Sequence, residues 1–324
     1  METLPDFHLL HPRSVPEAVA ARIADARTRF LAGGTDLLAN MRHGLIDADT
    51  LIDLSAIPEL RRLEVGASGL TIGAGVTLES LTSHPLIARD YGALSQAAQS
   101  VAGPTHRIVA TVGGNLCLDT RCRFYNQSEP WRASNAYCLK HAGDTCRVAL
   151  KADRCYAAFS GDLAPALMVL GAKAEIAGAQ GKRVQPLGDL YNDDGKAHLV
   201  LAPEDLLVGV QIPAPQGLRS AYDKVRMRGA IDFPLAGVAV ALRRDGPRIA
   251  ELRIATTATE SQPASIRGLD AVAGSLPEEV LPRLEKIVRK QLGMMETYLI
   301  SAGYRRRAAL VLVKRLVEGL LRAE

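Results

Sequence analysis

The chain has no long hydrophobic run. Nowhere in its 324 residues is there a window of about 18 apolar residues free of charge, the length that a membrane-spanning helix requires. We therefore expect no membrane span. The first ten residues carry acidic side chains and lack a basic segment followed by an apolar core, so we predict no signal peptide.

Cysteine is also scarce, with five residues in the chain. An odd number without an export signal argues against a disulfide framework and for a reducing compartment, so we expect a cytoplasmic protein. Four of the five fall within one stretch, separated by 15, 7 and 8 residues: Cys122, Cys138, Cys146 and Cys155. None of these gaps has the short spacing of two to four residues that is typical of structural zinc sites, which disfavours zinc.

Aromatic residues are few as well, namely five Phe, eight Tyr and one Trp. Six of these 14 lie in the same stretch as the four cysteines: Phe124, Tyr125, Trp131, Tyr137, Tyr156 and Phe159. Flexible loops are normally poor in aromatic residues, so we expect this stretch to be ordered. A small segment needs a staple to stay ordered, and a bound metal group is one.

The net charge of +4 is confined to that stretch. Residues 121–160 hold seven Lys/Arg and three acids, whereas the rest of the chain holds 32 of each sign. Such an excess would offset an anionic cluster on thiolates, steer an acidic partner, or mark no more than a solvated loop. No nucleic-acid-binding motif accompanies it, so we do not expect nucleic acid as a partner.

Two double-glycine turns stand out, although neither has the G-x-G-x-x-G spacing of a Rossmann fold. Residues 31–37 (LAGGTDL) join a predicted strand to a predicted helix, and residues 110–115 (ATVGGN) repeat the pattern. Each is either an ordinary tight turn or a place where backbone N–H groups approach a phosphate. Two such turns could grip a dinucleotide pyrophosphate from both sides.

The remaining pattern predicts an α+β protein of three parts. We expect a first α/β subdomain over residues 1–57, a second over 58–217 that contains the cysteine stretch at about 120–160, and a C-terminal α+β domain over 218–324. Its Tyr304–Arg307 run predicts the exposed start of a final amphipathic helix. The main predicted elements are helices at 14–27, 37–43, 78–102, 161–171, 281–292 and 305–321, strands at 29–32, 51–54, 70–77, 174–176, 206–212, 236–242 and 249–257, and a linker at 214–220.

Five segments, in order, resemble the FAD subunits of the molybdenum hydroxylase (xanthine oxidase) family: residues 30–38, 111–116, 160–167, 206–213 and 232–239. The resemblance covers nearly the whole chain. It implies a two-subdomain FAD-binding fold, like that of vanillyl-alcohol oxidase and PCMH, followed by a C-terminal α+β domain.

Carried over residue by residue, the resemblance implies a set of FAD contacts. The two turns would grip the pyrophosphate and ribose, with Thr111 bonded to a phosphate. Val101 and Ala102 would lie beside the flavin, Asp162 would meet the adenosine half, Leu207 would pack near the adenine, and Lys224 would be a nearby positive group. From the residues alone, Asp162 could equally cap a helix, and Lys224 could be solvated. The full set is Leu31, Ala32, Gly33, Gly34, Thr35, Asp36, Leu37, Val101, Ala102, Ala110, Thr111, Gly113, Gly114, Asn115, Asp162, Leu207 and Lys224.

The stretch at 120–160, called the insert below, is missing from most members of the family. From spacing alone its four cysteines could ligate a [4Fe–4S] cluster, hold zinc, or be free buried cysteines. Within the family, the insert is similar to one in the flavin subunits of 4-hydroxybenzoyl-CoA reductases, and this favours the cluster. Cys117 follows the second glycine turn directly, so we assign it to that turn and leave it out of the ligand set.

The resemblance also implies a function for the chain. It would pass electrons from a reduced ferredoxin through [4Fe–4S] and FAD to partners: a [2Fe–2S] small subunit and a molybdopterin-binding large subunit, in a dimer of heterotrimers. No residue of this chain would be catalytic. Two alternatives stay open: an FAD subunit of an oxidative hydroxylase, of the carbon monoxide or purine type, with zinc in the insert, and a non-enzymatic metal-stabilised interaction module.

Overall fold

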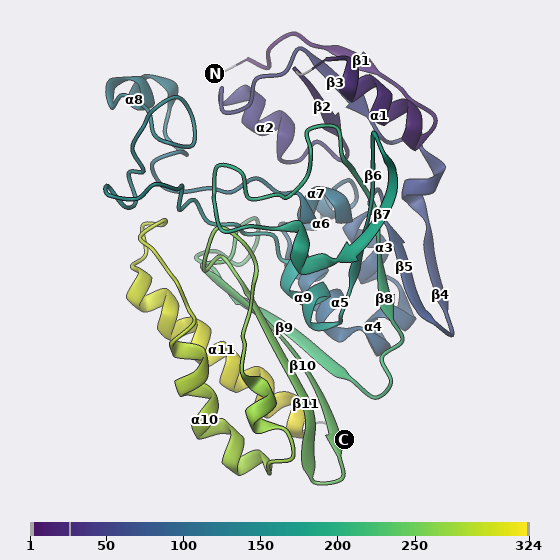
Figure 1. The fold of residues 1–324 in the computed structure, drawn as a ribbon, viewed down its shortest axis with the longest axis vertical. Coiled ribbons are helices and arrows are strands. Elements are labelled where there is room, and N and C mark those ends of the chain that lie inside the picture. The colour runs from purple at the N-terminus through teal and green to yellow at the C-terminus, as the bar shows by residue number, and fades with distance from the viewer. Residues whose placement is uncertain (1–2, 26, 323–324) are drawn as a thin grey trace.

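A computed structural model describes residues 3–25 and 27–322. It contains three separate β-sheets, arranged from the N-terminal elements at one end to the helices α10 and α11 at the other (Figure 1). The predicted domain limits at residues 1 and 324 lie outside the described residues. Within the described part, no helix is both long enough and apolar enough to cross a membrane.

The first sheet is parallel and small. Its strand order is β1–β3–β2, with β1 at His8–Leu10, β2 at Thr28–Leu31 and β3 at Thr50–Asp53. Helix α1 (Val15–Ala24) begins where the sequence predicts, because the Ser14 hydroxyl accepts the N–H of Glu17 at 3.4 Å. Helix α2 (Leu37–Arg42) returns the chain to β3. The first glycine turn therefore lies between β2 and α2.

The second sheet is antiparallel, in the order β4–β5–β8–β6–β7. The strand predicted over 70–77 ends at Gly73, because the N–H of Val76 turns back to the Gly73 carbonyl at 3.1 Å. Its strands are β4 (Leu63–Gly66), β5 (Gly69–Gly73), β6 (Lys173–Gly178), β7 (Gly181–Pro186) and β8 (Leu206–Pro213). The accompanying helices are α3 (Leu78–Thr82), α4 (Pro85–Asp90), α5 (Gly92–Ser100), α6 (Pro104–Arg107), α7 (Val112–Leu116) and α9 (Leu163–Val169), with 3₁₀ turns η1 (Pro58–Arg61) and η2 (Leu187–Leu190).

The third sheet is buried on both faces. Along β10, Val238 and Val240 pack under the C-terminal helices, while Ala239 and Ala241 face the core of the second sheet. The predicted linker at 214–220 is shorter than expected, because β9 already begins at Arg219 and pairs with β10. The order is β12–β11–β10–β9, with β9 (Arg219–Val225), β10 (Ala236–Asp245), β11 (Arg248–Thr257), β12 (Ala264–Ser265), η3 (Leu269–Val272), α10 (Pro277–Arg289) and α11 (Ala302–Arg322).

The insert packs against both ends of the molecule. A backbone bridge closes its base, with Arg121 and Ala158 exchanging N–H···O bonds of 2.9 and 2.8 Å. The Tyr125 hydroxyl donates to the Leu45 carbonyl at 3.0 Å, and the N–H of Arg123 donates to the Thr297 carbonyl at 2.8 Å. Its one helical segment, α8 (Glu129–Ser134), lies at the outer edge of the molecule, beside α2 in the view of Figure 1.

The prediction of an exposed start to the final helix is wrong for Arg305, which is fully buried. Its Nε donates to the Leu235 carbonyl at 2.8 Å and its Nη1 to the Met295 carbonyl at 2.9 Å, while Nη2 reaches the Ala258 carbonyl. The guanidinium also lies 4.4 Å from the centre of the Tyr298 ring. One side chain thus satisfies backbone acceptors from three segments.

Replacing this side chain should be costly. We expect Arg305→Met to lower the free energy of unfolding by at least about 3 kcal/mol, because several buried carbonyls would lose their only charged donor. Urea titration of the purified protein measures the change. Arg307→Met, at an exposed position of the same helix, is the control and should change stability by less than about 0.5 kcal/mol. Equal losses in the two variants would contradict this role.

Stability should also depend on pH through His198. This ring is buried and its Nε2 donates to the Leu118 carbonyl at 2.9 Å. Burial lowers the pKa of His198 to about 4, whereas the unfolded chain titrates near 6.5. Its contribution is therefore complete above pH 6.5 and is lost as the pH falls toward 4. We expect a loss of about 2 kcal/mol in unfolding free energy between pH 7 and pH 5, measured by urea titration. His198→Gln should flatten this dependence; an unchanged pH profile in that variant would refute the assignment.

Candidate functional site

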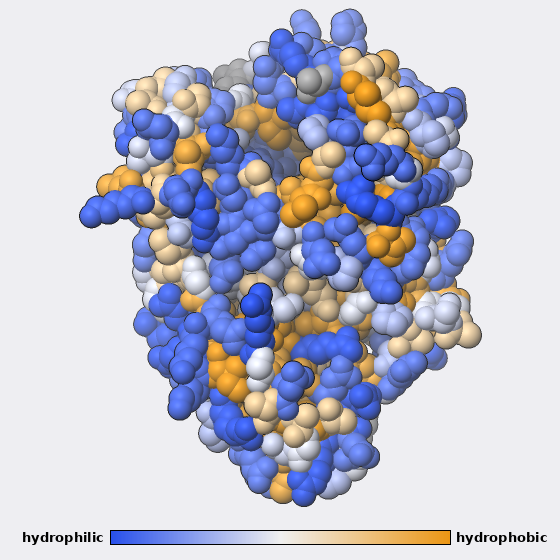
Figure 2. Space-filling view, in the orientation of Figure 1, coloured by the Kyte–Doolittle hydropathy of each residue, from blue (hydrophilic) through white to orange (hydrophobic). Residues whose placement is uncertain are grey.

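The two glycine turns lie directly against each other. A Cβ atom at Gly33 would collide with the carbonyl oxygen of Val109 and would approach the Cα of Ala110 to 3.1 Å. Only glycine allows this backbone contact. The structure thus joins residues 31–37, between β2 and α2, to the start of the second turn. Figure 2 shows the surface hollowed between the insert and the N-terminal elements, with apolar side chains lining the hollow near α2.

The second turn is built as a short helix start. The Thr111 hydroxyl accepts the N–H of Gly114 at 3.1 Å, so this hydroxyl caps α7. A Cβ at Gly113 would lie 2.7 Å from the Cβ of Ala74, and the N–H of Gly113 donates to the Ala74 carbonyl at 2.7 Å. Both glycine turns are therefore held in place by close backbone contacts that a side chain at Gly33 or Gly113 would prevent.

Asn115 connects the second turn to the Asp162 segment. Its side-chain Oδ1 accepts the N–H of Leu163, the first residue of α9, at 2.9 Å. This bond satisfies one of the free N–H groups at the start of α9. The sequence-predicted contact of Asn115 with the cofactor stays a prediction.

Asp162 and Lys224 form a buried ion pair. The Lys224 ammonium lies 2.9 Å from Oδ1 of Asp162, and the side chains are 2% and 3% exposed. The Tyr222 hydroxyl donates to Asp162 at 2.6 Å, and Ser100 lies 3.4 Å from the same oxygen. Burial and the Asp162 charge raise the pKa of Tyr222. These contacts join α5 and α9, which accompany the second sheet, to β9 of the third sheet.

The contacts of Asp162 and Lys224 rule out two alternatives that the residues alone left open, namely that the Asp162 side chain caps a helix and that Lys224 is solvated. Lys224 is not solvated, and the Asp162 carboxylate is engaged by Lys224 and Tyr222 instead of capping α9. Leu207 lies within β8 and is buried in the main core, away from an open surface. The contact of Asp162 with the adenosine half, the packing of Leu207 near the adenine and the position of Lys224 near the cofactor stay predictions.

Val101 and Ala102 lie in a strained segment beside exposed apolar side chains. Ala102 has a φ of 44° and accepts the N–H of Ile231, whose own φ is 51°. A positive φ at a β-branched residue is strained, and such strain is concentrated at functional sites. Ile108, Val109, Ile231 and Phe233 are exposed large hydrophobic residues of these neighbouring segments. They offer the apolar surface that a flavin ring needs.

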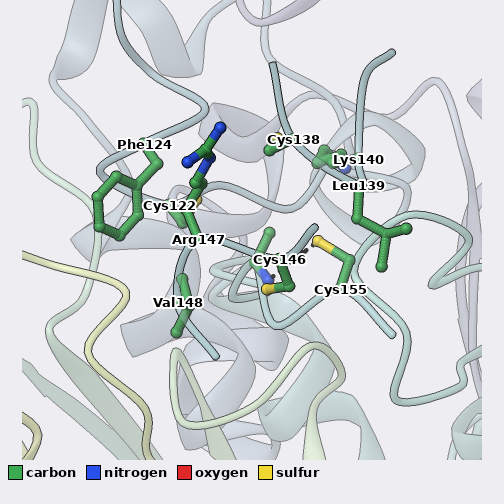
Figure 3. A pocket seen from close by; sticks show the side chains of 10 residues that line it. Cys122, Phe124, Cys138, Leu139, Lys140, Cys146, Arg147, Val148 and Cys155 are labelled. Carbon is green, nitrogen blue, oxygen red and sulfur yellow. Dashed lines mark hydrogen bonds between the residues drawn. The ribbon is translucent and has the colours of Figure 1, made fainter. Parts of the chain in front are cut away.

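The four insert cysteines line a single cavity. All four are buried, and Figure 3 shows Cys146 and Cys155 facing each other, with Cys122 and Cys138 on other sides of the space. Cys117 lies outside this lining and packs against the main core, as its assignment to the glycine turn requires. The other lining residues are Phe124, Leu139, Lys140, Arg147, Val148 and Ala157.

Backbone N–H groups point at the sulfur atoms. The N–H of Tyr125 donates to Sγ of Cys122, and that of Ala157 donates to Sγ of Cys155, both at 3.4 Å. The Cys155 thiol donates to Cys146, which lowers the pKa of Cys146 to about 5 and raises that of Cys155. Burial raises the pKa of Cys122. Such N–H···S contacts favour thiolates and are typical of iron–sulfur ligands.

The chemistry of the cavity lining suits a group that is held by thiolates. Among the described residues, no group of three or more His, Cys, Asp or Glu side chains is arranged so that it could hold a metal ion as the side chains stand. A tetrahedral zinc would need its sulfurs about 3.8 Å apart, whereas a cube of iron and sulfide separates its thiolates further. In the described part of the chain, the cavity lining includes the cations Lys140 and Arg147 and no carboxylate. Four thiols, directed N–H groups and positive charge are the chemistry that an iron–sulfur cluster requires.

Lys140 and Arg147 belong to the cavity lining, although the sequence predicts them only as part of the positive charge of the insert. Their positions in the sequence, two residues after Cys138 and one after Cys146, were the available signal.

Comparison with known proteins identifies the family. A family profile described as "FAD binding domain in molybdopterin dehydrogenase" matches residues 5–215. The chain belongs to this family. It is an FAD-binding oxidoreductase subunit of the molybdenum hydroxylase type.

Curated relatives agree with this assignment. The chain is 35% identical over 262 residues to an aldehyde oxidoreductase FAD-binding subunit of Escherichia coli, which covers 78% of this chain and 80% of the relative. It is 28% identical over 256 residues to the carbon monoxide dehydrogenase medium chain of Hydrogenophaga pseudoflava, covering 78% and 75%.

Solved structures share the fold. A carbon monoxide dehydrogenase of Hydrogenophaga pseudoflava superimposes with a TM-score of 0.79 at 24% identity, covering 98% of this chain and 97% of that one. Quinoline 2-oxidoreductase of Pseudomonas putida 86 gives a TM-score of 0.77 at 22% identity, covering 99% and 98%. The predicted α+β, two-subdomain FAD-binding fold is thereby confirmed.

The contact between the turns makes a direct prediction. We expect Gly33→Ala to weaken FAD binding by at least about tenfold, or about 1.4 kcal/mol, because the added methyl group would push the turns apart. The FAD content after gel filtration and a flavin fluorescence titration of the apoprotein measure the effect. Gly319→Ala, in helix α11 and facing open space among the described residues, should keep full FAD content. Normal FAD affinity in Gly33→Ala would show that the contact is dispensable.

Proposed function

We propose that this chain is the flavin and iron–sulfur subunit of a 4-hydroxybenzoyl-CoA reductase. The observation that carries the proposal is the set of four buried thiols around one cavity, in an insert that begins five residues after the second glycine turn ends. A flavin subunit that needed only FAD would have no use for a second electron-carrying site at this position.

In this proposal Cys122, Cys138, Cys146 and Cys155 hold one [4Fe–4S] cluster, which supplies one-electron transfer when bound. The chain's own residues position and tune that site. The N–H groups of Tyr125 and Ala157 donate to the sulfurs of Cys122 and Cys155, and Phe124, Leu139 and Val148 line the cavity with apolar groups.

FAD would bind at the two glycine turns, where the glycines let the backbone approach the pyrophosphate closely and the Thr111 hydroxyl proton could be donated to a phosphate oxygen. The flavin converts between one-electron and two-electron steps. Its ring would lie at Val101 and Ala102, against the exposed apolar residues of the neighbouring segments.

The reaction served would be reductive. 4-Hydroxybenzoyl-CoA takes up two electrons and two protons and gives benzoyl-CoA and water at a molybdenum site on a partner subunit. A reduced ferredoxin would supply the electrons, which reach the molybdopterin-binding large subunit through a [2Fe–2S] small subunit. We place the enzyme in the cytoplasm, as a dimer of heterotrimers. The relation to proteins named medium chains supports a role as one subunit among several.

One alternative has an observation in its favour. The curated relatives are named for oxidative enzymes, among them carbon monoxide dehydrogenase and xanthine dehydrogenase. An FAD subunit of that type, with the insert cysteines holding zinc, would bind FAD in the same way and would contain no iron. Membership of an oxidoreductase family speaks against a non-enzymatic interaction module.

Metal analysis distinguishes these functions. We expect the purified chain to contain about four iron and four acid-labile sulfide per FAD, measured by plasma emission spectrometry, sulfide assay and flavin absorbance. Cys138→Ser should remove the iron and leave FAD bound, because the glycine turns do not involve that residue. Cys117→Ser is the matched control and should retain both. One zinc and no iron in the wild type would overturn the proposal, as would full iron content in Cys138→Ser.

A further inference from the structure

A chain of four charged side chains, of which the two cations are buried and the two carboxylates half-buried, connects the cysteine cavity with the first glycine turn. The Lys140 ammonium bonds Oδ1 of Asp119 at 2.8 Å. The other oxygen of Asp119 lies 3.7 Å from the Arg121 guanidinium, which lies 3.8 Å from the carboxylate of Asp36. Tyr125 lies beneath both cations, with its ring centre 5.4 Å from Arg121 and 5.2 Å from Lys140.

The two ends of this chain belong to different sites. Asp36 is part of the first glycine turn, at the start of α2. Lys140 is part of the lining of the cysteine cavity, where Figure 3 shows it beside Cys138. The four charged residues therefore lead from the lining of the cysteine cavity to the turn that would hold the FAD pyrophosphate.

Both cations are buried and fixed. The side chain of Lys140 is 5% exposed, and its ammonium also bonds the Thr120 hydroxyl at 2.8 Å and the Gly195 carbonyl at 2.6 Å. Arg121 is 9% exposed. Its Nη1 and Nη2 lack hydrogen-bond partners among the described residues, so its guanidinium interacts with its surroundings through charge. Buried charges are poorly screened by salt and act over longer distances than surface charges.

We propose that this charge bridge sets the reduction potentials of both redox sites, with Lys140 acting on the group held by the cysteines and Arg121 on the flavin. The inference rests on the proposed function for its cysteine end and on FAD binding alone for its flavin end. Both cations are positioning residues, because they act through their field and not by contact with a substrate.

The sign of each effect follows from charge. Reduction adds an electron to either group, so a fixed positive charge nearby favours the reduced form and raises the potential. Asp119 lies between the two cations and opposes them. Removing Lys140 should therefore lower the potential at the cysteines, and neutralising Asp119 should raise it. A purely structural role would not produce opposite shifts.

The test at the cysteines uses the full chain with its cofactors, titrated with redox dyes and followed by the electron paramagnetic resonance of reduced iron–sulfur. We expect Lys140→Gln to shift the midpoint potential down and Asp119→Asn to shift it up. Lys140→Arg should restore the wild-type value, and Lys151→Gln, an exposed lysine of the insert, should leave it unchanged. Shifts of the same sign in Lys140→Gln and Asp119→Asn, or equal shifts in Lys140→Gln and Lys151→Gln, would overturn the proposal.

The test at the flavin follows its absorbance in the same titrations. We expect Arg121→Gln to lower the flavin midpoint, whereas Arg123→Gln, at the exposed neighbouring arginine, should not. This part is decided even in a chain that contains no iron, so a failure of the proposed function remains distinguishable from a failure of this inference. Equal flavin midpoints in Arg121→Gln and the wild type would overturn it.

Discussion

The backbone contact between the two glycine turns is the constraint on which the site depends. Because a Cβ at Gly33 would strike the Val109 carbonyl, the parallel sheet of the first subdomain and the helices of the second are held at one distance. The insert begins directly after α7, so the same contact fixes where its first residues lie. For this reason the Arg121 guanidinium lies 3.8 Å from the Asp36 carboxylate, and Cys122 follows Arg121 directly in the chain.

The insert is closed and held by contacts that give its cysteines a fixed arrangement. The bridge between Arg121 and Ala158 brings its ends together, and contacts to Leu45 and Thr297 hold it against the first and third parts of the molecule. Closing a loop of this length costs entropy, which these contacts and any cluster on the four thiols would offset together. Such a cluster would stabilise the insert as well as carry electrons.

Features set by local sequence were predictable, and features set by distant contacts were not. The Ser14 cap, both glycine turns and the grouping of four cysteines each depend on residues close in sequence. The Asp162–Lys224 pair and the burial of Arg305 depend on residues more than 60 positions apart. Lysine and arginine side chains usually lie at the surface. Lys224 and Arg305 are buried because the packing of the third sheet brings them hydrogen-bonding partners. The start of β9 was missed because its pairing with β10 supplies the strand's hydrogen bonds.

The positive charge of the insert is largely buried and does not form a basic surface. Three of its seven cations, Arg121, Arg132 and Lys140, have buried side chains that interact with groups inside the molecule. Of the four others, Arg147 lines the cysteine cavity and Arg154 pairs with Asp193. The exposed cations Arg123 and Lys151 are accompanied by three exposed acids, Glu129, Asp144 and Asp153, so the surface of the insert is not basic. Most of the excess thus faces inward, toward the cysteines and the flavin turn. An electron donor would find little charge on the surface of the insert to steer it. The ferredoxin proposal consequently rests on the four thiols and not on a basic surface.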